Sequence, residues 1–212
     1  MNYFKVLLIV FFSAILVSSC KQPQEARRPI SHSSGSFMKQ SIARNKKMIA
    51  NEEDQIEAVI KKDPTKQYIA SKKGYWYYYE TRNLNDSLNP KKGDIALFDY
   101  EIKDLDGKII YSQEELEPQI YKVDKQEIMM GLRDGIKLMR KKEKVHFLFT
   151  SHMGYGYHGD NNKIGTNQPL LCTVTLNDFM PESEYNKQMQ TTVTASKVNA
   201  PVKSNTKDSL TN

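Results

Sequence analysis

Hydrophobic residues near the start of the chain form one nearly unbroken run. Residues 6–17 are large and apolar apart from Ser13 and Ala14, and Lys5 supplies a positive charge just before them. A membrane-spanning helix needs about 20 apolar residues, and this run is shorter. We therefore expect residues 1–19 to be a signal peptide that is removed from the mature protein.

A polar stretch and then an amphipathic pattern follow. Residues 21–36 carry a single large aliphatic side chain, Ile30, so residues 20–36 are predicted to be a flexible tether. From Phe37 to Lys62, apolar residues recur at spacings of four and seven, namely Met38, Ile42, Ile49, Ile56 and Ile60. This spacing predicts an amphipathic helix in the segment of residues 37–66, stopping before Pro64.

The apolar stripe of this helix leaves two alternatives open. It is compatible with packing against its own domain. It is equally compatible with docking on another protein, including a second copy of this chain in a homodimer.

Residues 67–184 show the patterns of one small domain. Stretches rich in aromatic and β-branched residues predict strands over residues 68–82, 94–103, 109–112, 120–123, 145–151 and 170–177. Asp106-Gly107 between the second and third of them is typical of a hairpin turn. The stripe formed by Ile128, Leu132 and Ile136 predicts one helix over residues 128–139.

These elements predict an α+β domain of five or six mostly antiparallel strands in a bent sheet around one short helix. Gly131, inside that helix, is expected to lie close to another backbone. Residues 185–212 have little apolar content and are expected to be a disordered tail.

The junction after the first apolar run carries a chemical signal. Residues 16–20 read Leu-Val-Ser-Ser-Cys, which resembles the lipobox of bacterial lipoproteins, so Cys20 is expected to carry the lipid. The alternative is an ordinary signal peptide with an incidental cysteine. Lys21 stands where an aspartate retains some lipoproteins in the inner membrane, which favours a periplasm-facing protein anchored in the outer membrane.

Charge and the remaining candidate ligands exclude other classes of function. The net charge of +6 is spread along the chain, which favours a solvated surface and weak attraction to anionic membranes rather than nucleic-acid binding. His146, His152, His158 and Asp160 are irregularly spaced, so no metal is expected. Cys172, in an apolar strand, is predicted to be a buried, inert thiol.

Several motifs together resemble FKBP-type peptidyl-prolyl cis-trans isomerases. Residues 126–139 resemble the central helix of that family. Between about residues 92 and 179, further motifs follow the order of the family: Phe98-Asp99-Tyr100, Asp106-Gly107-Lys108, Gly154-Tyr155-Gly156-Tyr157 and residues 170–176. Residues 71–77 and the lipobox make the chain similar to FKBP-type lipoproteins associated with gliding motility.

The resemblance implies a cofactor-free isomerase acting on X-Pro segments of envelope proteins. The alternative is a non-catalytic module, chaperone or structural component that grips such segments.

The resemblance also implies a site. Tyr100, Tyr155 and Met129 are expected to act on the peptide, with the Tyr155 hydroxyl and the Met129 backbone N–H bound to its carbonyls. The pocket walls are expected to be Ile110, Tyr111, Tyr121, Ile128, Leu132, Ile164 and Cys172. Taken without the family, Tyr100, Ile128 and Leu132 have the pattern of core residues.

Three positions depart from the family pattern. Tyr111 stands where an acidic residue is common, Leu132 where a tryptophan is common, and Cys172 where a phenylalanine is usual. The site is therefore expected to be less aromatic than is usual in the family and to lack one polar contact at its rim.

Overall fold

The computed structural model describes Tyr3 and residues 34–198. The predicted signal peptide, the lipidation site at Cys20 and most of the predicted tether lie outside the described residues, as do residues 199–212. The chain divides into two units, Met1–Ile42 and Ala43–Asn212.

The first long element is helix α2, Ser34–Lys62. It begins three residues before the predicted helix, so the predicted tether is wrong for residues 34–36. In the first unit, the side chains of Phe37, Met38 and Ile42 are exposed. In the second unit, Glu52 and Ile56 of the same helix are buried. Beyond its end, the Asp63 carboxylate accepts a hydrogen bond from the Thr65 N–H at 3.2 Å, and Pro64 cannot continue a helix.

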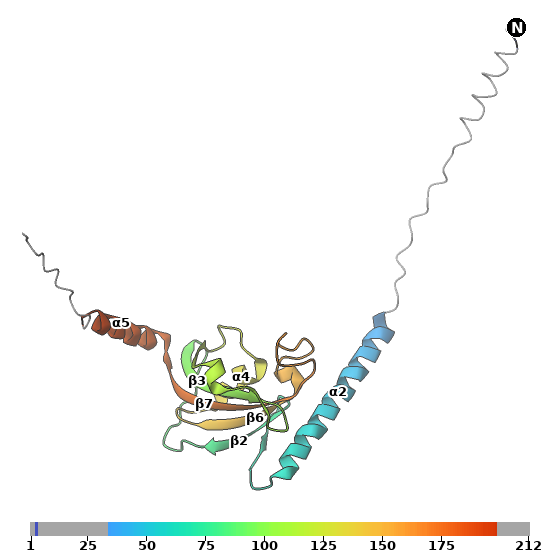
Figure 1. Ribbon diagram of the computed structural model, residues 1–212, viewed down its shortest axis with the longest axis horizontal. Coiled ribbons are helices and arrows are strands. Elements are labelled where there is room, and N and C mark those ends of the chain that lie inside the picture. Colours follow the sequence, from blue (N-terminus) through green and yellow to red (C-terminus); the bar gives the residue numbers. More distant parts are fainter. Residues whose placement is uncertain (1–2, 4–33, 199–212) are drawn as a thin grey trace, which may run out of the picture. The chain divides into compact units, whose positions relative to one another are not determined.

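The core of the second unit is an antiparallel sheet of seven strands. They are β1 (Ile69–Ala70), β2 (Tyr75–Thr81), β3 (Asp94–Lys103), β4 (Ile109–Tyr111), β5 (Gln119–Lys122), β6 (Lys144–Phe149) and β7 (Leu170–Pro181). The order across the sheet is β1-β2-β6-β7-β3-β4, and β5 also pairs with β3. The predicted antiparallel α+β architecture is confirmed (Figure 1).

The seventh strand arises because the predicted strand over residues 68–82 is interrupted. Ser71 N–H donates to the Tyr75 carbonyl at 2.8 Å, and Gly74 has a φ of +82°. Such a φ suits glycine and reverses the chain. β1 therefore folds back as a separate two-residue strand, with Ala70 opposite Trp76.

Strand alternation gives β2 and β6 two distinct faces. Tyr75, Phe147 and Phe149 point into one buried cluster. Trp76 and Leu148, which are opposite each other across the two strands, point to the other face. Leu148 and Ile56 of α2 are both fully buried yet are not members of that cluster.

The central helix is shorter than predicted. Helix α4 covers Met130–Gly135 and continues into a 3₁₀ turn, η1, over Ile136–Leu138. Figure 1 shows it against the sheet. A β-carbon on Gly131 would lie 2.5 Å from Cε1 of Phe149, and one on Gly135 would lie 2.8 Å from Cζ of Phe147. Gly131 thus lies close to the aromatic ring of Phe149. The prediction that it lies close to another backbone is wrong.

Three further helical elements complete the described fold. Helix α3, Gln113–Leu116, and the 3₁₀ turn η2, Ser151–Met153, lie in connections between strands. Helix α5 covers Glu182–Val198. The predicted disorder is therefore wrong for residues 185–198: Glu182 and Glu184 favour a helix N-terminus, and apolar content alone does not decide helix formation.

Within the described residues, no helix combines the length and the apolar character needed to cross a membrane.

Candidate functional site

The residues that the sequence singled out gather around one hydrophobic core. Six of them are partly buried and pack against that core: Tyr100, Ile110, Tyr111, Ile128, Met129 and Tyr155. Four are buried in it: Tyr121, Leu132, Ile164 and Cys172. The first group can contact a ligand, whereas the second group supports it from below.

Tyr155 stands in a tightly bonded loop that follows η2. The carbonyl of Ser151 accepts hydrogen bonds from the N–H groups of Gly154, at 3.0 Å, and Gly156, at 2.8 Å. The Gly156 carbonyl in turn accepts one from the Asn167 N–H at 2.9 Å. Gly156 has a φ of +63°, a conformation that favours glycine. These bonds fix the backbone on both sides of Tyr155.

The electrostatic surroundings keep the two site tyrosines neutral. Burial raises the pKa of Tyr155 to about 12, and the neighbouring Tyr100 and Cys172 add to this shift. Burial likewise raises the pKa of Tyr100, with smaller contributions from Cys172 and Tyr111. Both hydroxyls are therefore protonated at neutral pH and can donate hydrogen bonds.

Tyr111 has a carboxylate partner that the sequence analysis did not anticipate. Its hydroxyl donates to the Asp160 carboxylate and accepts from the Asn162 side-chain amide at 3.1 Å. Burial works to raise the pKa of Asp160, but hydrogen bonds from Tyr111 and the Ile164 N–H outweigh it and lower that pKa. The loop that carries Tyr155 therefore brings a carboxylate to this rim, while the expected loss of a polar contact to the peptide stays a prediction.

Tyr121 differs from the other tyrosines of the predicted site. Its ring is only 1% exposed, and its hydroxyl accepts a hydrogen bond from the Asp124 N–H at 3.0 Å. That hydroxyl is occupied inside the protein. Tyr121 is consequently a core residue beneath the site rather than a wall that offers a polar group.

Met129 lies where extended chain turns into α4. Its φ of −47° and ψ of 131° place it just outside the helix, and its carbonyl accepts the Arg133 N–H at 3.0 Å. Its own N–H is therefore outside the helical hydrogen-bond ladder. This geometry is compatible with the predicted role of that N–H as a donor to a peptide.

Cys172 is the deepest of the predicted site residues. Its side chain is fully buried on β7, and burial raises the pKa of its thiol far above the usual range. The thiolate is therefore not formed at neutral pH, and Cys172 acts as a small apolar residue. In the part of the chain that the structure describes, no three His, Cys, Asp or Glu side chains gather to hold a metal ion.

Comparison of the sequence with known families adds to this geometry. A sequence model of the FKBP-type peptidyl-prolyl cis-trans isomerases matches residues 87–177. Residues 87–177 therefore form an FKBP-like domain. The match runs from just before β3 to β7, and it includes every residue of the predicted site.

One curated relative of the FKBP domain is a probable FKBP-type peptidyl-prolyl cis-trans isomerase of Haemophilus influenzae. It is 28% identical over 120 residues, which are 56% of this chain and 48% of that protein. The chain thus spans about half the length of this relative.

Two solved structures share the fold of the FKBP domain. FkpA from Escherichia coli is 24% identical, with 84% of this chain and 82% of that one covered and a TM-score of 0.52. A peptidyl-prolyl cis-trans isomerase from Pseudomonas syringae pv. tomato is 19% identical, with 63% and 94% covered and a TM-score of 0.50. These likenesses confirm the predicted FKBP-like fold.

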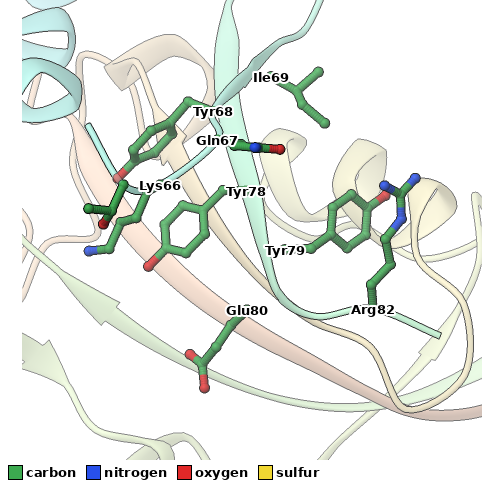
Figure 2. A pocket seen from close by; sticks show the side chains of 9 residues that line it. Lys66, Gln67, Tyr68, Ile69, Tyr78, Tyr79, Glu80 and Arg82 are labelled. Atoms are coloured by element: carbon green, nitrogen blue, oxygen red, sulfur yellow. The ribbon is translucent and has the colours of Figure 1, made fainter. Parts of the chain in front are cut away.

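A cavity of about 650 Å³ lies at another edge of the sheet, beside β1 and β2 (Figure 2). Tyr68 and Tyr78 meet edge to face in it with ring centroids 4.9 Å apart, and the Lys66 ammonium lies 5.2 Å from the Tyr78 ring. Arg82 lies over the ring of Tyr79. β6 and β7 separate β2 from β3, which carries Tyr100, so this cavity is distinct from the predicted site. Two of the residues that line this cavity, Tyr78 and Tyr79, belong to the aromatic run of residues 75–79 in the sequence.

Proposed function

We propose that this chain is a lipid-anchored peptidyl-prolyl cis-trans isomerase that assists the folding or assembly of cell-envelope proteins. The observation behind the catalytic part is the position of Tyr155: a neutral hydroxyl on a fixed loop, beside Tyr100 and over an apolar core. The match of residues 87–177 to the FKBP family supports the same reaction.

The reaction needs an apolar site more than it needs acid, base or metal. Rotation about an X-Pro amide has a barrier of roughly 18–20 kcal/mol, and the uncatalysed event takes roughly tens to hundreds of seconds. Twisting the bond removes amide resonance, so charge leaves the carbonyl oxygen. Surroundings that exclude water therefore favour the twisted amide over the planar one.

Each residue has a defined task in this proposal. Ile110, Ile128 and Tyr100 provide the apolar surface on which the proline ring lies. The Tyr155 hydroxyl and the Met129 N–H hold carbonyls of the peptide on either side of the rotating bond. Leu132, Ile164 and Cys172 keep that surface dry and fixed from beneath.

A protease-free NMR exchange assay on an X-Pro peptide tests the catalytic part, with the full chain in detergent micelles. We expect exchange faster than the uncatalysed rate, and Tyr155→Phe should lower kcat/KM about two- to tenfold, the worth of one hydrogen bond. Tyr157→Phe is the matched control, because Tyr157 lies on the same loop with its side chain 73% exposed.

Exchange at the uncatalysed rate would overturn the isomerase proposal. The rival proposal, a non-catalytic module that grips proline-containing segments, would then require binding of the same peptide. Leu132 and Cys172, where the family commonly has aromatic residues, favour this rival. Equal activity of Tyr155→Phe and the unmodified chain would refute the role given to Tyr155.

The lipid anchor is a separate part of the proposal and depends on Cys20 and the lipobox before it. From the same resemblance we propose a location in the outer membrane of the cell envelope and a role in gliding motility. Cys20→Ser should move the chain from the membrane fraction to the soluble fraction of the cell envelope, as measured by fractionation and immunoblotting. Cys172→Ala should leave it in the membrane fraction. Retention of the Cys20→Ser chain in the membrane would refute acylation as the anchor.

A further inference from the structure

A buried acidic side chain joins helix α2 to the loop that follows β6. The side chain of Glu52 is 3% exposed, although it ends in a carboxylate. One carboxylate oxygen accepts the backbone N–H of Ser151 at 2.7 Å, and the other accepts the Ser151 hydroxyl at 2.7 Å. Both oxygens of the carboxylate are thus bound to one residue, 99 positions further along the chain.

Ser151 is hydrogen-bonded both to Glu52 and to the loop of the predicted site. Its N–H and hydroxyl face Glu52, while its carbonyl accepts the N–H groups of Gly154 and Gly156. These two glycines flank Tyr155. A continuous path of hydrogen bonds therefore runs from α2 through Ser151 to the backbone on both sides of the Tyr155 side chain.

Breaking the hydrogen bonds between Glu52 and Ser151 is costly in free energy. Both hydrogen bonds to Glu52 are buried, so breaking either would leave polar groups unsatisfied away from water. The arrangement therefore resists local opening. Ile56, one helical turn beyond Glu52, is fully buried and holds the same face of α2 in place.

We propose that Glu52 is a positioning residue for the loop that carries Tyr155, an inference that rests on the proposed isomerase function. Glu52 does not touch the peptide. By binding Ser151, it fixes the turn from Ser151 to Gly156 and so the direction of the Tyr155 hydroxyl. The second half of α2 is by this account part of the working site.

Two variants test this role in the full chain. Glu52→Ala removes both acceptors of Ser151, and Ser151→Ala removes only the hydroxyl donor. Glu53→Ala is the matched control, since it removes the same atoms one position along α2. The amides of Gly154 and Gly156 are followed by hydrogen exchange, which needs no catalysis.

We expect exchange of the Gly154 and Gly156 amides to become on the order of tenfold faster in Glu52→Ala, and less so in Ser151→Ala, with Glu53→Ala unchanged. Activity should fall through kcat/KM. In a double-mutant cycle, Tyr155→Phe should have a smaller effect when Glu52 is already alanine, because both changes act through one hydroxyl.

Two results would overturn the inference. The first is unchanged exchange of both amides in Glu52→Ala, whether or not activity falls. The second is an effect of Tyr155→Phe that multiplies fully with that of Glu52→Ala, as expected if Glu52 affects stability alone. If Glu52→Ala does not fold, Ser151→Ala decides by the same criteria. An inactive but folded wild-type chain would refute the isomerase proposal, while exchange would still decide whether Glu52 fixes the loop.

Discussion

Replacing Phe147 with alanine is expected to lower the free energy of unfolding by about 3–5 kcal/mol, the range for losing a fully buried aromatic side chain. Phe147 is 0% exposed and stacks on Phe149 with ring centroids 5.4 Å apart. Its ring also meets that of Tyr75 edge to face at 6.1 Å. The surrounding rings cannot all move inward, so a cavity remains where Phe147 was.

Urea unfolding followed by circular dichroism measures this loss. Phe37→Ala is the matched control, because the same atoms are removed from a side chain that is 73% exposed. The control should change the free energy of unfolding by no more than about 0.5 kcal/mol. A Phe147→Ala chain as stable as this control would mean that β6 and α4 do not share the core described above.

Gly131→Ala is expected to cost about 1–3 kcal/mol by overpacking, although alanine is the better helix former. The new β-carbon would lie 2.5 Å from Cε1 of Phe149. Phe149 cannot move aside easily, because its ring stacks on Phe147 and contacts that of Tyr75 at 5.5 Å. Helix α4 must therefore lift from the sheet, which also displaces Met129 at its start.

The thermal midpoint of unfolding measures the effect of this change. Gly165→Ala is the control, since its new β-carbon would lie 3.5 Å from the Gln168 side-chain oxygen, an ordinary contact. The control should unfold near the wild-type temperature and Gly131→Ala several degrees lower. Equal midpoints for both variants would show that the ring of Phe149 has room to yield.

The sheet was largely predictable because its strands have local signals. Asp94–Lys103 begins and ends as predicted, since the apolar residues and flanking turns mark both limits. The predicted strand over residues 68–82 failed at the turn of residues 71–74, where the positive φ of Gly74 reverses the chain between two short runs that favour strands. α5 was missed because the prediction weighed hydrophobicity and gave no weight to helix propensity.

Only part of the candidate site could be predicted from the sequence. Tyr100, Tyr155 and the apolar residues around them could be named from motifs, and the structure gathers them on one core. The partners that fix them could not. Asp160 reaches Tyr111 across 49 positions, and Glu52 reaches Ser151 across 99. A hydrogen bond between residues so far apart leaves no periodicity in the sequence.

The isolated tryptophan of this chain gives the molecule an internal optical reporter. Trp76 is the single tryptophan among twelve tyrosines, so light above the tyrosine absorption excites it alone. It lies on the sheet face away from the aromatic core, opposite Leu148 across the strand pair. Its emission therefore reports on the surroundings of that face more directly than on the aromatic core. Loosening there can consequently be followed in the unmodified protein, without a dye and without altering the predicted site residues.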